Sequence, residues 1–142
     1  MKAERWVIDT NVLISAALLR GSLPAARVGR VLRSCRIVFS SATFAELETR
    51  IWRPKFRRDI TLENRELVLH DLAAAAEWVE PARVATNSGD ADDDKFVHAA
   101  LAARARWLVA ADSDLLTLGQ VEDVVILTPA QALRRLKGLR GA

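Results

Sequence analysis

The chain has 142 residues and is 51% hydrophobic, which suits a single domain over residues 1–142 that closes its own core. Its single cysteine, Cys35, excludes an internal disulfide and a thiolate zinc site, and no apolar run reaches the roughly 18 residues of a membrane helix. No signal-peptide pattern opens the chain, so a reducing cytoplasmic location is expected, and the net charge of +3 does not by itself identify a partner.

The first half of the chain alternates short apolar runs with amphipathic segments. We predict, in chain order, a strand at Arg5–Asp9, helices at Asn11–Leu19 and Pro24–Leu32, a strand at Arg36–Phe39 and a helix at Ala42–Trp52. Ser40 and Ser41 are candidate N-caps for the last of these helices, because their hydroxyl groups can accept from the first backbone N–H groups. Pro54 ends that helix.

The second half continues the same alternation. We predict a helix from Leu62 to about Trp78, a short strand centred on Val84, a helix at Asp92–Ala105, strands at Arg106–Ala111 and Val124–Leu127, and a last helix from Pro129 to Gly138. Trp6, Trp78 and Trp107 are predicted to lie in the core. Strands that alternate with helices predict an α/β fold: a three-layer α/β/α sandwich around a parallel sheet of about four to five strands.

The acidic residues occupy the places where such a fold binds ligands. Asp9 and Asp112 each end a buried strand, Glu46 lies within an apolar helix, and Asp94 stands in the first turn of another helix. Ligands bind at the carboxyl ends of the strands in an open α/β sheet. Two carboxylates about 4 Å apart repel by roughly 4 kcal/mol at an effective dielectric near 20. A hard divalent cation with oxygen ligands is the simplest relief of that repulsion.

Each acid also has a purely structural interpretation. Asp9 and Asp112 can be helix N-caps, and Glu46 can be a solvated helix residue. The carboxylates of Asp92–Asp94 can be stabilised by the helix dipole in the first turn of their helix. These roles do not explain why three consecutive acids follow Asp90, nor why four acidic positions fall at one end of one predicted sheet. No Gly-rich phosphate loop follows the first strand, which argues against a dinucleotide site or a P-loop ATPase.

The ordered set of motifs resembles the PIN-domain nucleases over nearly the whole chain. Within that family it resembles the toxin components of toxin–antitoxin systems. The motifs are Val-Ile-Asp-Thr-Asn-Val-Leu at 7–13, Glu-Leu at 46–47, Arg-Pro-Lys-Phe at 53–56, Asp-Ala-Asp-Asp-Asp-Lys-Phe at 90–96 and Ala-Asp-Ser-Asp-Leu-Leu at 111–116. Two mild departures, Ala110-Ala111 before the fourth acid and Asp90-Ala91-Asp92 in place of a frequent Asp-Pro-Asp, remove no ligand.

The resemblance implies a metal-dependent endoribonuclease with a PIN-like fold. The four family acids fall on Asp9, Glu46, Asp94 and Asp112, and a further acid that is often present falls on Asp114. One or two Mg²⁺ or Mn²⁺ ions would be held by Asp9, Asp94 and Asp112, with Glu46 binding a second ion or orienting the attacking water. Asp93 is a neighbour whose role is left open, and Thr10, Asn11 and Ser113 would orient the ligands. The implied partners are RNA and a cognate antitoxin protein. A homodimer is left open, and no membrane is involved.

A basic stretch follows the helix that carries Glu46. Its cations are Arg50, Arg53, Lys55, Arg57 and Arg58. The simplest interpretation is a solvated helix end around a buried Trp52. RNA could also bind here, with phosphates on the cations and bases stacked on Trp52 and Phe56, or an antitoxin or a second subunit could dock.

Two other functions are kept as alternatives. One is a non-catalytic RNA-binding or scaffold module on the same fold. The other is a phosphatase of the haloacid-dehalogenase kind, which also places an Asp after its first strand. That chemistry needs a second Asp two residues later, where this chain has Asn11.

Overall fold

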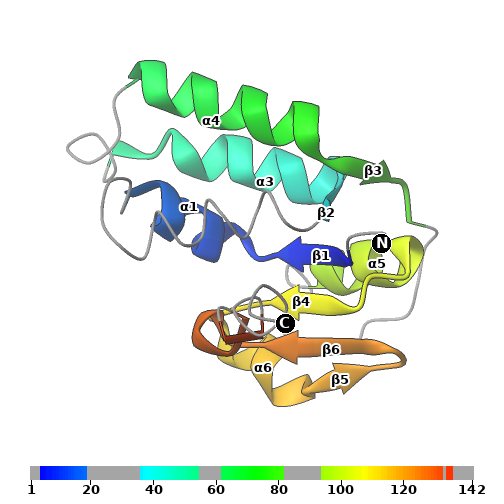
Figure 1. The fold of residues 1–142 in the computed structure, drawn as a ribbon. Helices are drawn as coiled ribbons and strands as arrows, with labels where there is room; N and C mark the ends of the chain where they lie inside the picture. The colour runs from blue at the N-terminus through cyan, green and yellow to red at the C-terminus, as the bar shows by residue number, and fades with distance from the viewer. Residues whose placement is uncertain (1–3, 19–35, 55–61, 82–93, 133, 136–142) are drawn as a thin grey trace.

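A parallel sheet organises the molecule. The computed structural model describes residues 4–18, 36–54, 62–81, 94–132 and 134–135, and the structural statements below concern these residues. The strands are β1 (Arg5–Ile8), β2 (Arg36–Ser40), β3 (Glu77–Val79), β4 (Trp107–Val109), β5 (Gln120–Val121) and β6 (Val124–Leu127). They form one sheet in the order β3-β2-β1-β4-β6-β5 (Figure 1). Only β5 runs antiparallel to its neighbour, and two short edge strands, β3 and β5, bring the number of strands above the predicted four to five.

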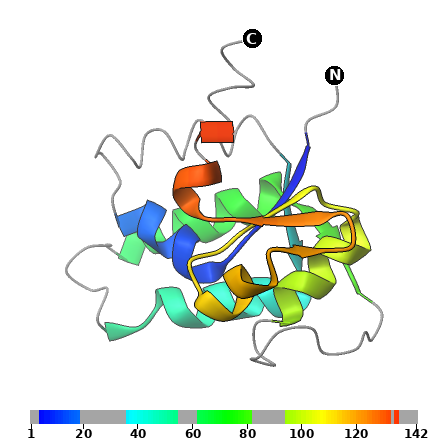
Figure 2. The same ribbon diagram turned by 90° about the horizontal axis from the view of Figure 1, so that it is seen from below.

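Helices cover both faces of this sheet, as predicted. They are α1 (Thr10–Leu18), α3 (Ser41–Ile51), α4 (Leu62–Ala75), α5 (Asp94–Ala103) and α6 (Ser113–Leu118), and residues 129–132 are also helical. In Figure 2, α5 and α6 lie below strands β4 and β6, while the helical residues 129–132 lie above them. The helix predicted at Pro24–Leu32 and the strand predicted at Val84 fall outside the described residues.

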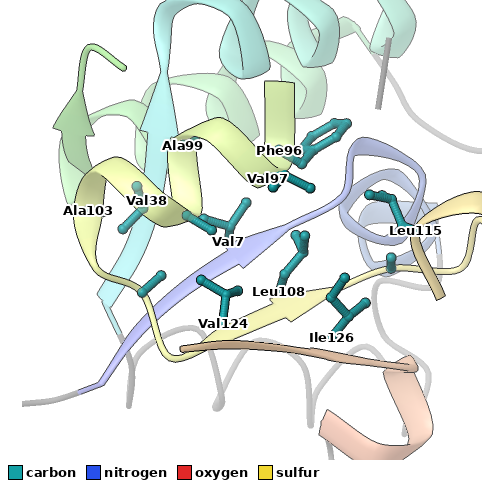
Figure 3. Packing of buried hydrophobic residues seen from close by; sticks show 13 residues of the cluster. Val7, Val38, Phe96, Val97, Ala99, Ala103, Leu108, Leu115, Val124 and Ile126 are labelled. Atoms are coloured by element: carbon teal, nitrogen blue, oxygen red, sulfur yellow. The ribbon is translucent and has the colours of Figure 1, made fainter. Parts of the chain in front are cut away.

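Successive side chains of the central strands enter two different core clusters. On β1, Val7 joins the cluster beneath α5 and α6, whereas Trp6 and Ile8 join the cluster on the other face. The first cluster is drawn in Figure 3, where α5 lies over the strands and contributes Phe96 and Val97. Because the strands are buried on both faces, their sequences are continuously apolar rather than alternating.

The second cluster joins the sheet to three helices. Leu13 and Ile14 of α1 and Leu47 of α3 are buried against it, and Leu69 and Leu72 of α4 pack at its margin. Helix α3 begins at a capping box. The Ser40 hydroxyl accepts from the Thr43 N–H group, and the Thr43 hydroxyl accepts from the Ser40 N–H group. The helix that carries Glu46 is therefore fixed at its start and along its buried side.

The predicted boundary of the long helix after Leu62 is wrong at its C-terminal end. Helix α4 ends at Ala75, and Glu77–Val79 form β3, which pairs in parallel with β2. Trp78 is not in the core but 45% exposed, and its ring lies against Phe39 and Phe44. Strand pairing and aromatic packing therefore override the helix propensity of the preceding alanines.

Candidate active site at the carboxyl edge of the sheet

Asp9 lies where the central strand becomes a helix. Its backbone N–H donates to the Val109 carbonyl of β4 (2.8 Å), so the ends of β1 and β4 lie side by side. Its own carbonyl accepts from Val12 and Leu13, and its carboxylate accepts from the backbone N–H of Asn11 (3.4 Å). Asp9 therefore serves as the N-cap of α1, which is its predicted structural role, and it does so at the carboxyl edge of the sheet.

The Asp9 side chain is buried among other acids. The residue is only 3% exposed, and this burial raises the pKa of its carboxyl group above the usual value. The backbone N–H groups of Asn11 and Ala111 lower the same pKa, while the nearby carboxylates of Glu46 and Asp112 raise it further. Carboxylates from three distant parts of the chain, those of Asp9, Glu46 and Asp112, therefore interact electrostatically at this edge.

Glu46 projects from α3 into the same region. Its side chain is 9% exposed, so it is not the solvated helix residue of the structural interpretation. The Thr10 hydroxyl donates to Oε2 of Glu46 (2.5 Å), while Lys95 Nζ and Arg50 Nη2 lie 3.1 and 3.0 Å from Oε1. Thr10, which we expected to orient Asp9, thus holds the neighbouring acid, and it is buried in doing so.

The other two family acids begin helices. Asp94 is the first residue of α5 and is 4% exposed, immediately before Lys95. Asp112 is half-buried and caps α6 by accepting from the backbone N–H of Asp114 (2.8 Å). Asp114 is exposed in the first turn of α6, and Ser113 is exposed beside it. Asp93 lies outside the described residues, as do the other acids at 90–92.

Two cations contact Glu46, and the sequence motifs predict neither contact. The ion pair of Lys95 with Glu46 joins α5 to α3. Arg50, which the sequence predicts to lie at a solvated helix end or in contact with RNA, pairs with Glu46 one helical turn away and donates to the Asn11 side-chain oxygen (3.3 Å). The spacing of four residues between Glu46 and Arg50 is the one signal in the sequence for this pair.

The rest of the basic stretch is described only in part. Arg53 is exposed at the end of α3, and Lys55, Arg57 and Arg58 lie outside the described residues. Trp52 is 40% exposed rather than buried, and the guanidinium of Arg65 stacks 5.6 Å from its ring centroid. Arg65 lies in the first turns of α4, so this cation–π contact joins α4 to the end of α3.

The donor chemistry of this edge fits a hard divalent cation. Asp9 is buried, and Glu46 and Asp112 oppose its ionisation, a repulsion that a cation would relieve. In the part of the chain that the structure describes, no three carboxylate, imidazole or thiolate groups are gathered closely enough to hold an ion. Glu46 instead has Lys95 and Arg50 as its cations. A metal ion at Glu46 would therefore have to share its carboxylate with these two cations or displace one of them.

Comparison with known proteins identifies the family. The sequence model of the PIN domain matches residues 5–114, from the first residue of β1 to Asp114. The chain belongs to the PIN domain family. The expected family is thereby confirmed, and the haloacid-dehalogenase alternative loses its basis. No curated protein matches the chain.

Solved structures share this PIN fold at low sequence identity. PAE2754 from Pyrobaculum aerophilum is 18% identical, with a TM-score of 0.62 over 97% of this chain and 99% of the other. VapBC-1 from nontypeable Haemophilus influenzae is 19% identical, with a TM-score of 0.54 over 89% and 98%. VapBC2 from Rickettsia felis, bound to a fragment of promoter DNA, is 13% identical, with a TM-score of 0.55 over 87% and 98%. These likenesses establish the predicted fold alone.

Within the residues described, none of the helices is both long enough and apolar enough to cross a bilayer.

Proposed function

We propose that this PIN-domain protein is a metal-dependent endoribonuclease that hydrolyses phosphodiester bonds of RNA. The observation that carries the proposal is the buried Asp9 at the carboxyl edge of the sheet, whose ionisation is opposed by Glu46 and Asp112. Burying mutually repelling carboxylates costs free energy, and folded proteins normally offset that cost with a nearby positive charge. Family membership supports the same chemistry, because PIN domains with this set of acids are nucleases.

Each residue of the site has a proposed role. Asp9, Asp94 and Asp112 would hold Mg²⁺ or Mn²⁺, and Glu46 would bind a second ion or orient water. Such an ion supplies water of lowered pKa and positive charge against the charge that develops on the phosphate. The backbone N–H groups of Asn11 and Ala111 keep the Asp9 carboxylate in place, and the Thr10 hydroxyl fixes one oxygen of Glu46.

RNA cleavage tests this proposal. A mixed single-stranded RNA pool is incubated with the protein in EDTA, Mg²⁺ or Mn²⁺, and wild type is compared with Asp9→Asn and Asp94→Asn. We expect cuts that require the metal and that fall in rate by roughly 100-fold in both variants, since each loses a ligand charge. Asp71→Asn is the matched control because Asp71 is exposed on α4, and it should cut like wild type.

We further propose that the protein is the toxin of a toxin–antitoxin pair. Two of its structural neighbours are VapBC proteins, although their likeness to this chain is one of fold. Expression of the wild-type protein should arrest bacterial growth, whereas expression of Asp9→Asn should not. If a small gene adjoins the gene for this chain, co-expression of its product should restore growth, and that product should co-purify with this chain. Growth arrest by both forms would show that arrest does not depend on the acid site.

One observation favours a second function, a non-catalytic RNA-binding module. Lys95 and Arg50 already neutralise the Glu46 carboxylate, so that part of the site has its counter-charge within the protein. This alternative predicts RNA binding that is unchanged in Asp9→Asn, without cleavage in any metal. The RNA pool experiment separates the two functions when binding and cleavage are measured on the same samples.

A further inference from the structure

Three donors from three different elements converge on the carboxylate of Glu46. Oε1 is shared between Lys95 Nζ at 3.1 Å and Arg50 Nη2 at 3.0 Å. Oε2 accepts from the Thr10 hydroxyl at 2.5 Å. With its side chain 9% exposed, Glu46 has both oxygens engaged in a place that water scarcely reaches.

The two cations differ in how firmly they are held. Arg50 lies one turn from Glu46 on α3 and also donates to the Asn11 side chain, so its guanidinium is fixed at two points. Lys95 comes from α5, and among the described residues its ammonium is paired with Glu46 alone. A lysine ammonium on a flexible four-carbon stem can leave a carboxylate at lower cost than a doubly held guanidinium.

We propose that Lys95 is a built-in counter-cation of the acid site: it neutralises Glu46 in the metal-free protein and competes with the divalent ion for the same oxygen. This inference rests on the proposed function, because it takes Glu46 to be part of the metal site. Lys95 is a positioning residue in this scheme. It follows Asp94 directly, so its departure from Glu46 would couple the start of α5 to metal binding.

The competition predicts two effects of opposite sign when Lys95 loses its charge. The metal-free protein becomes less stable, because a nearly buried Glu46 carboxylate keeps only Arg50 as its counter-charge. The metal-bound protein is favoured, because one competing positive charge is removed next to the ligands. A merely structural Lys95 would lower both stability and metal affinity when it is replaced.

The experiment is calorimetric titration of the EDTA-stripped full-length protein with Mn²⁺ alone, together with thermal unfolding before metal is added. We expect Lys95→Met to bind Mn²⁺ with a Kd about tenfold lower than wild type and to show a metal-free Tm a few degrees lower. Lys95→Arg, which keeps the charge, should return both values toward wild type. Lys95→Gln replaces Lys95→Met if the apolar side chain impairs folding.

Arg36→Met is the matched control. It removes the same charge at the amino end of β2, where Arg36 is half exposed, at the opposite edge of the sheet. Its Kd for Mn²⁺ should stay within about twofold of wild type, because exposed charges farther apart than about 10 Å are screened at moderate salt.

The outcomes separate this inference from the proposed function. Tighter Mn²⁺ binding with lower metal-free stability supports the counter-cation role of Lys95. Equal or weaker binding in Lys95→Met and Lys95→Gln, with binding abolished in Asp9→Asn, overturns the role of Lys95 and leaves the metal site standing. If wild type binds no Mn²⁺, there is no competition at Glu46, and both proposals fail.

Discussion

At the scale of single residues, Asp9 combines two roles that usually oppose each other. As an N-cap it stabilises the start of α1 through the Asn11 N–H group. As a buried carboxylate beside Glu46 and Asp112 it costs free energy when it is ionised. A residue that is selected only to cap a helix need not carry this cost, because a Ser or Asn would cap equally well.

This cost predicts that Asp9→Asn stabilises the metal-free protein. The side-chain oxygen of Asn can still accept from the Asn11 N–H group, while the repulsion by Glu46 and Asp112 disappears. We expect the Tm in EDTA at pH 7 to rise by roughly 2–5 °C. Asp71→Asn, an exposed change on α4, should leave the Tm unchanged. A lower Tm for Asp9→Asn would show that its charge is already compensated in the metal-free protein.

The sequence identifies the acids of the site but not all of their partners. Asp9 and Asp112 follow apolar runs, and Glu46 interrupts an apolar helix, so each is visible as a charge where burial is expected. The contact of Thr10 with Glu46 and that of Lys95 with Glu46 join residues 36 and 49 positions apart. No local pattern encodes such contacts, because they depend on how α1, α3 and α5 pack together.

At the scale of elements, the capping box of α3 holds the helix that presents Glu46. The Ser40 side chain accepts from the Thr43 N–H (3.2 Å), and the Ser40 N–H donates to the Thr43 hydroxyl (2.9 Å). Ser40→Ala should lower the free energy of unfolding by about 1 kcal/mol, as measured by urea denaturation. Thr49→Ala on the same helix is the control, since its exposed hydroxyl bonds only the Ala45 carbonyl. Equal effects of the two changes would show that the cap contributes nothing specific.

The edge strand β3 is tied to β1 by an ion pair that spans β2. The Arg5 guanidinium, which donates to Glu77 (2.8 Å), holds the pKa of Glu77 below its usual value against the effect of partial burial. A carboxyl group with a lowered pKa in the folded state stabilises the protein above its unfolded pKa. This stability is lost as the pH falls through the folded pKa.

The ion pair therefore predicts a pH-dependent effect of Glu77→Gln. Near pH 7 the variant should unfold about 1–3 °C below wild type, because the pair is partly exposed and screened. The difference should disappear in the acid range, once Glu77 of the wild type is protonated. Glu66→Gln, an exposed change on α4, should show no difference at either pH. A Glu77→Gln deficit that persists at low pH would assign the effect to packing rather than to charge.

The strands that the sequence predicts best are those buried on both faces. β1, β2, β4 and β6 are mostly apolar runs that the sequence predicts, although β2 extends one residue beyond its predicted end and β4 ends two residues before it. β3 and β5 have three and two residues, which is too short for a periodic signal. Their pairing is determined by neighbours: the antiparallel partner of β5 is β6, and Trp78 of β3 rests on Phe39 and Phe44.

At the scale of the whole molecule, stability depends on the two clusters on either side of the sheet. Leu108 of β4 is fully buried in the cluster beneath α5 (Figure 3). Leu108→Ala should lower the free energy of unfolding by about 2–5 kcal/mol, because it removes apolar contacts and leaves a cavity. Leu62→Ala is the matched control, since Leu62 is 66% exposed, and its effect should stay within about 0.5 kcal/mol. Urea denaturation of the three proteins measures both effects.

Anomalous difference density from crystals of the protein grown with Mn²⁺ would show whether the acids at the carboxyl edge of the sheet hold a divalent ion. We expect a strong peak within coordination distance of the Asp9 carboxylate and of at least one other of Glu46, Asp94 and Asp112, and no such peak in Asp9→Asn. Well-ordered wild-type crystals with no anomalous density at this edge would overturn the proposed metal site, and the acids would then be helix caps and ion-pair partners alone.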